Sequence, residues 1–152
     1  MVNPSRRFIK KPHFYRPETR FQLNNHQILY TDVLIYISLR SFYNSTDHQC
    51  FPALETIAEL AGVCKKFVIK SIRRLEKAQY ISVYRSKMIK VVNHYDFEEA
   101  FNYDRIPYDI FLCNDLTFYE KSMLLALREL TDVSTPFDFK GTLTEIAETL
   151  RV

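Results

Sequence analysis

The segment from Lys65 to Ala78 restricts the fold more than any other part of the sequence. With about 100° of rotation per helical residue, the apolar side chains of Val68, Ile72 and Leu75 fall within about 60° of one another. The charged outer face of a helix ordinarily carries both positive and negative residues, but here the side opposite Val68 carries only positive ones. This pattern predicts an amphipathic helix whose outer face contacts a polyanion. Between about 140° and 200° from Val68 lie Lys66, Lys70, Arg73 and Lys77, and Lys65 and Arg74 flank them.

Two apolar segments precede this helix. Residues 28–43 are apolar nearly all round, and so long a run favours a buried helix over a buried strand. Pro52 opens a second, shorter helix, and Gly62 follows its last apolar residue, where helices commonly end with glycine. The three segments therefore predict a helix, a short helix, a turn and a basic helix.

After the basic helix, the spacing of the apolar residues changes from a helical repeat to alternation with polar residues. Alternating residues in Tyr80–Tyr84 and in Met88–Tyr95 predict two strands of a hairpin. The polar turn between them carries Arg85 and Lys87. We therefore expect a hairpin with a basic tip beside the basic helix.

Residues 25–97 resemble the winged helix-turn-helix domain of phage and plasmid replication initiators and related regulators. The family pattern combines a leucine, an isoleucine-alanine pair, a Gly-Val turn and a basic helix leading into the wing. Asn93-His94-Tyr95 is similar to the Asn-x-Tyr that often ends the second wing strand. The resemblance implies a mainly α fold with a small β-hairpin wing (α+β). The matching residues are Leu54, Ile57, Ala58, Gly62, Val63, Val68, Ile72, Leu75, Tyr80 and Ile81.

Three residues depart from the family pattern. Cys64 stands where a serine or threonine usually caps the basic helix, so we expect a weak cap. Phe67 replaces a small polar residue, which predicts either an apolar contact with a thymine methyl group or added core. Gln79 replaces the glycine before Tyr80, so the helix must end without the residue that most readily takes a positive φ.

Residues 98–152 are predicted to form a second, incomplete winged-helix-like unit. The segment 116–128 parallels the first helix with an offset of 88, which pairs Asp32 with Glu120. Residues 143–152 parallel the second helix with an offset of 89, and Thr142 and Glu145 form a capping-box pattern. This correspondence with the first two helices ends at the turn, before a second basic helix would begin. We therefore expect one of two arrangements. Either the protein is longer, with a basic amphipathic helix following Val152, or the last helix is covered by a protein partner or a second copy of the chain.

Charge is separated along the chain. The whole protein has a net charge of only +3, but residues 1–90 carry a net +10 and residues 91–152 a net −7. Residues 1–24 form a basic arm interrupted by prolines, which disfavour a helix. We expect this arm either to be solvated or to grip a phosphate backbone. Its basic residues are Arg6, Arg7, Lys10, Lys11, Arg16 and Arg20, and the first four of them are the predicted DNA contacts.

Several other chemistries are disfavoured. The chain has two glycines and so lacks a Gly-rich phosphate loop, and three cysteines without a C-x-x-C pair argue against a disulfide framework or a zinc site. Four scattered histidines give no nucleophile-base spacing. We expect no enzymatic activity, no catalytic residue, no cofactor and no metal. Without an apolar run of about 18 residues or a secretory signal, we expect a cytoplasmic protein that does not enter a membrane.

These observations predict a protein that binds double-stranded DNA in a sequence-specific manner. Replication initiation is the preferred role, and transcriptional regulation is the alternative. A third interpretation is a protein-protein interaction module that uses residues 98–152, either with another protein or as a homo-oligomer. The predicted DNA contacts are Lys65, Lys66, Lys70, Arg73, Arg74, Lys77, Arg85 and Lys87, together with Arg6, Arg7, Lys10 and Lys11 of the arm.

Overall fold

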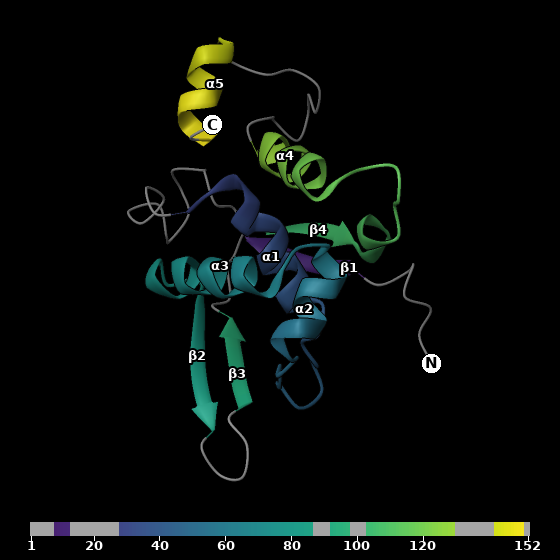
Figure 1. Cartoon of the computed structure of the whole chain (residues 1–152), viewed down its shortest axis with the longest axis vertical. Coiled ribbons are helices and arrows are strands. Elements are labelled where there is room, and N and C mark those ends of the chain that lie inside the picture. The colour runs from purple at the N-terminus through teal and green to yellow at the C-terminus, as the bar shows by residue number, and fades with distance from the viewer. Residues whose placement is uncertain (1–7, 13–27, 87–91, 98–102, 130–141, 151–152) are drawn as a thin grey trace.

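The computed structural model describes residues 8–12, 28–86, 92–97, 103–129 and 142–150 (Figure 1). These residues form a mixed α/β arrangement in which the strands pair as two antiparallel two-stranded sheets, β1 with β4 and β2 with β3. A 3₁₀ helix, Tyr108–Phe111, follows β4. In chain order the other elements are β1 (Phe8–Pro12), α1 (Tyr30–Arg40), α2 (Leu54–Ala61), α3 (Lys65–Lys77), β2 (Ile81–Ser86), β3 (Val92–Phe97), β4 (Tyr103–Pro107), α4 (Phe118–Glu129) and α5 (Leu143–Leu150).

Helix α1 lies at the centre of the molecule, with α2, α3, α4 and β1 around it (Figure 1). All of its residues from Thr31 to Arg40 are buried. A helix that is apolar all round can be stable only when neighbours cover every side of it. The prediction of a buried helix in residues 28–43 is therefore confirmed, with its ends two to three residues inside the apolar run.

The α2–α3 unit has the predicted helix-turn-helix form. Gly62 adopts the left-handed conformation, with φ 81°, and the Ala58 carbonyl accepts hydrogen bonds from the backbone N–H groups of Gly62 and Val63. A residue with a side chain would be strained at this φ, so glycine sets the turn that leads into α3. Helix α3 then buries Val68 and Leu75 completely against the core.

Strands β2 and β3 form the wing and project away from α3 (Figure 1). The register pairs Ile81 with Phe97 and Val83 with Tyr95, so apolar side chains share the face toward the helices. Arg85 pairs with Asn93 inside the ladder. The prediction that Arg85 and Ser86 lie in the turn is therefore wrong, because the pairing of β2 with β3 continues as far as Ser86 and Val92.

The pairing of β1 with β4 was not predicted, although the arm was expected to be extended. Phe8 lies opposite Pro107, and Ile9 opposite Ile106. Both isoleucines are buried. The arm segment 8–12 is consequently part of the folded core.

Helices α4 and α5 form in the segments that correspond in sequence to the first and second helices. In α4 the N–H of Thr117 donates to the Glu120 carboxylate, and in α1 the N–H of Leu29 donates to Asp32. The paired acids Asp32 and Glu120 therefore occupy the same position, the third residue of the helix. In α5 the predicted capping box between Thr142 and Glu145 is present in both directions.

Helix α4 packs against α1 across the predicted boundary at residue 97, through the buried side chains of Phe118 and Leu125. Burying one such side chain stabilises the fold by about 1.5–3 kcal/mol. The division into units 25–97 and 98–152, and the winged-helix character of the second unit, stay predictions.

Candidate nucleic-acid interface

The two faces of α3 have the character that the sequence predicted. Val68, Ile72 and Leu75 are buried, and Ser71 lies among them with no exposed surface. Five of the six cationic side chains of α3 are exposed to solvent, and Arg74 is partly buried. The outer face of the helix is therefore positively charged, and its exposed cations are Lys65, Lys66, Lys70, Arg73 and Lys77.

The first turn of α3 is unusually unfavourable for an isolated helix. It contains two lysines and no acid, although the N-terminus of a helix favours negative charge. Cys64 occupies the cap position, and among the described residues its side chain makes no capping hydrogen bond, as predicted. Lys65 pairs with Glu55 at 2.8 Å, but both side chains are largely exposed and such pairs contribute little. This turn therefore carries more positive than negative charge, which favours an anion.

A buried carboxylate fixes the orientation of α3. Asp32, on α1, is fully buried and accepts a hydrogen bond from the Ser71 hydroxyl at 2.6 Å. Its two oxygens also accept from Nε and Nη2 of Arg74, both at 2.8 Å, and Oδ2 accepts from the N–H of Leu29. Bidentate pairing of this kind is among the strongest and most directional polar contacts in proteins. These contacts with Asp32 fix which side of α3 faces α1 and which side faces outward.

Arg74 is consequently directed toward Asp32 and away from the outer face of α3, and its contact with DNA stays a prediction. Its guanidinium is held by Asp32, and its side chain is 27% exposed. Sequence reasoning also missed Asp32 and Ser71 as residues that position the interface. The available signal was a single acid, Asp32, in an otherwise apolar helix.

Phe67 belongs to the core. Its ring packs edge-on against the ring of Phe118 on α4, with centroids 5.3 Å apart. Of the two alternatives, added core and contact with a thymine methyl group, the structure supports the first. This contact joins the basic helix to the C-terminal part of the chain.

The wing is anchored beside α2 by a hydrogen bond from the N–H of Tyr95 to the Cys50 carbonyl. Arg85 is exposed on β2. Tyr84 is 71% exposed and its ring lies beside that of His94, the residue opposite it on β3. Lys87 lies outside the described residues. The wing therefore contributes one described cation to the interface.

The two described lysines of the arm have different surroundings. Lys11 is completely buried, and its ammonium lies 3.0 Å from Glu129 Oε1 and 3.8 Å from Asp104 Oδ2. The prediction that Lys11 contacts DNA is therefore wrong, because its charge is neutralised inside the fold. Lys10 is exposed, and its ammonium lies over the ring of Tyr103. Arg6 and Arg7 lie outside the described residues.

The Cys50 thiol is buried, and it donates a hydrogen bond to the Leu39 carbonyl at 3.3 Å. Burial raises the pKa of Cys50 to about 12. The thiol therefore stays protonated at neutral pH, which suits neither metal binding nor nucleophilic attack. The part of the chain that the structure describes contains no cluster of three or more His, Cys, Asp or Glu residues able to hold a metal ion.

Comparison with known protein families agrees with this geometry. Residues 30–81 match a helix-turn-helix domain. The match runs from the first residue of α1 to the first residue of β2. The helix-turn-helix domain thus includes Asp32, the Gly62 turn and the whole of α3, and it supports DNA as the partner of the exposed face of α3.

No curated protein and no solved structure matches the chain. Within the described residues, none of the helices combines the length and the apolar character that crossing a membrane requires.

Proposed function

We propose that this protein binds double-stranded DNA in a sequence-specific manner, with α3 of the helix-turn-helix domain in the major groove. The observation that carries the proposal is the contrast between the two sides of α3. Its outer side is exposed and cationic, and its inner side is locked to α1 by Asp32. A rigid cationic helix can present the same side chains to the same base pairs in each complex.

The position of each cation along α3 assigns its role. Lys66 and Lys70 lie toward the N-terminal end, the part of a recognition helix that reaches base edges. Arg73 and Lys77 lie farther along the helix and contact phosphates. Arg85 of the wing contacts a flanking phosphate.

The preferred biological role is phage or plasmid replication initiation, which rests on the resemblance of residues 25–97 to the winged-helix domains of initiators. Transcriptional regulation uses the same binding physics and is the alternative. Two assays on DNA selected by the protein from a random pool separate them. An initiator makes a plasmid bearing the selected site replicate, whereas a regulator changes transcription from a promoter that overlaps the site.

The binding test compares two variants that each lose two positive charges. Lys70→Ala/Arg73→Ala removes charge from α3, and Arg105→Ala/Lys121→Ala removes charge from β4 and α4. At fixed salt, we expect the α3 variant to bind the selected DNA about 30-fold more weakly, at about 1 kcal/mol per lost contact. The second variant should change the affinity by less than about threefold. Equal affinities for the two variants would reject α3 as the recognition helix.

A protein-interaction role is the second candidate function, and exposed apolar residues on α4 favour it. Tyr119 is 56% exposed and Leu124 is 54% exposed. Such residues on an outward helix face suit a protein partner. If the random pool yields no enriched DNA while Tyr119→Ala/Leu124→Ala abolishes a partner complex, this interpretation replaces DNA binding.

A further inference from the structure

Three aromatic side chains form a row across the outer face of the wing. Tyr84 on β2 and His94 on β3 lie opposite each other in the ladder, and their ring centroids are 6.1 Å apart. Along the other edge of β3, the N–H of Tyr95 donates to the Cys50 carbonyl. This contact brings the ring of Phe51 to 5.6 Å from that of His94. We call Tyr84, His94 and Phe51 the aromatic row.

The aromatic row is turned away from the core. Successive side chains of a strand point to opposite faces of a sheet, so Tyr84 and His94 point away from the face on which Val83 and Tyr95 pack. Tyr84 is 71% exposed and Phe51 is 53% exposed. Large apolar groups that gather on an exposed surface indicate a place where another molecule binds.

A hollow beside Phe51 connects the aromatic row with α3. It has a volume of about 530 Å³ and opens between the start of α2, the first residue of α3 and β3. Lys65 and Glu55, which pair with each other, add an ammonium and a carboxylate to its wall. The amide of Asn93 also lines it, and Nδ2 donates to the Tyr95 hydroxyl at 3.2 Å. The hollow thus places hydrogen-bonding groups beside an exposed ring, next to the proposed DNA interface.

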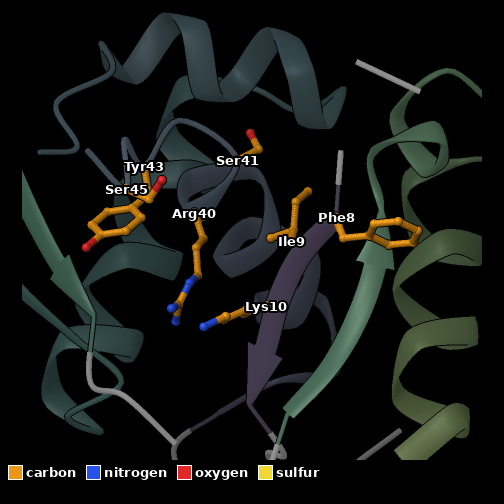
Figure 2. Close-up of a pocket in the computed structure, with 7 residues that line it drawn as sticks. All are labelled: Phe8, Ile9, Lys10, Arg40, Ser41, Tyr43 and Ser45. Carbon is orange, nitrogen blue, oxygen red and sulfur yellow. The ribbon is translucent and has the colours of Figure 1, made fainter. Parts of the chain in front are cut away.

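The hollow between β1 and the end of α1 has no such continuous aromatic surface (Figure 2). There the rings of Phe8 and Tyr43 lie on opposite sides, with Ile9 and Arg40 between them. Phe8 is 59% exposed, about as much as Phe51, but it belongs to the β1–β4 sheet. Phe8 is therefore a matched control for the aromatic row.

We propose that the aromatic row binds an unpaired DNA base, which stacks on the ring of Tyr84 or of Phe51. In a duplex the faces of the bases are covered by their neighbours, so a protein reaches only the base edges in the grooves. A base in a single strand exposes its face, and every base can stack on an aromatic ring. The row therefore fits a strand that leaves the duplex beside the helix-turn-helix domain.

The neighbouring polar residues suit the rest of such a strand. Asn93 lines the same hollow as Phe51, and its amide can donate to and accept from the edge of a base stacked there. Arg85 follows Tyr84 directly, is exposed, and supplies a cation for the phosphate backbone. The inference rests on the proposed DNA-binding function, and it adds a second form of DNA, the single strand, to the partners of the wing.

The first test measures the affinity of the full chain for a labelled single-stranded oligothymidylate by fluorescence anisotropy. Tyr84→Ala should bind it about tenfold more weakly, because a stacked base loses its aromatic partner. Phe51→Ala should also bind it more weakly, and Phe8→Ala should stay within about twofold of the wild type. For a closed duplex that carries the selected site, all three variants should stay within about threefold.

The second test uses the absence of tryptophan from the sequence. Tyr84→Trp keeps an aromatic ring in the row and places a single indole there, whereas Phe8→Trp places one in the hollow of Figure 2. A base that stacks on an indole quenches its fluorescence. We expect oligothymidylate to quench the fluorescence of Tyr84→Trp and to leave that of Phe8→Trp unchanged. Tyr84→Trp should also retain the affinity that Tyr84→Ala loses.

The proposal is overturned if Tyr84→Ala and Phe8→Ala bind oligothymidylate equally, or if the two tryptophan variants are quenched alike. It is also overturned if Tyr84→Ala weakens only duplex binding, since the row then contacts paired DNA. The test on α3 fails separately, because it compares Lys70→Ala/Arg73→Ala with its control on duplex DNA. An effect of Tyr84→Ala on the single strand without any effect of the α3 variant on the duplex rejects α3 alone.

Discussion

At the scale of single residues, Gln79 departs from the winged-helix pattern that the sequence resembles, and this departure has a conformational cost. The residue lies at the end of α3 with φ 67°, in the left-handed region. Its N–H donates to the Glu76 carbonyl, and the N–H of Tyr80 donates to the Leu75 carbonyl. These two hydrogen bonds form a Schellman motif, in which glycine is the usual residue at the position of Gln79.

Gln79→Gly should therefore stabilise the protein. Removing the side chain relieves a conformational cost of about 1 kcal/mol, and the greater freedom of glycine in the unfolded chain offsets part of the gain. We expect the free energy of unfolding to rise by about 0.5–1 kcal/mol in urea titrations, with an unchanged slope. Gln79→Ala is the control, because it shortens the side chain but keeps the Cβ. If alanine stabilises as much as glycine, strain at φ is not the reason.

At the scale of elements, the contact between α1 and α3 through Asp32 and Arg74 determines how the recognition helix is presented. Asp32→Asn removes the charge that Arg74 and Ser71 share. Breaking a buried ion pair typically costs 3–5 kcal/mol, and we expect about 3 kcal/mol here because Arg74 keeps some contact with water. A double-mutant cycle with Arg74→Met should give a coupling energy of at least about 1 kcal/mol.

The same cycle separates positioning from DNA contact. At a temperature where Arg74→Met remains folded, its DNA affinity should stay within about threefold of the wild type, whereas Lys70→Ala should bind about fivefold more weakly, at about 1 kcal/mol for the lost contact. Additive unfolding energies, or a loss of affinity in Arg74→Met as large as in Lys70→Ala, would assign Arg74 to the DNA-contacting set.

The sequence predicts the features that depend on residues close together in the chain, and it does not predict those that depend on partners distant in the chain. Helix α1 follows from the length of its apolar run, α2 and α3 follow from the spacing of apolar residues within each segment, and the turn between α2 and α3 follows from Gly62 alone. Lys11 and Arg74 look like surface cations in the sequence because their partners, Glu129 and Asp32, are distant in the chain. For the same reason the β1–β4 pairing could not be predicted, since nothing near Ile9 identifies Ile106 as its neighbour.

At the scale of the whole molecule, the separation of charge along the chain is partly neutralised inside the fold. Lys11, from the basic part, is buried against Glu129 and near Asp104, both from the acidic part. The positive charge available to DNA is therefore smaller than the net +10 of residues 1–90. On α3 and the wing, the described and exposed cations are Lys65, Lys66, Lys70, Arg73, Lys77 and Arg85.

This set predicts the salt dependence of binding. Each neutralised phosphate contributes about −0.9 to the slope of log K against log salt, so the four members that are not assigned to base edges give a slope near −3.6. Arg73→Ala/Lys77→Ala removes two of these phosphate contacts and should shift the slope by about 1.8 toward zero. That shift does not depend on how many further contacts the arm makes, because the arm is the same in both proteins. Fluorescence anisotropy over a series of salt concentrations measures both slopes. If they are equal, Arg73 and Lys77 do not bind phosphates, however strongly the protein binds DNA.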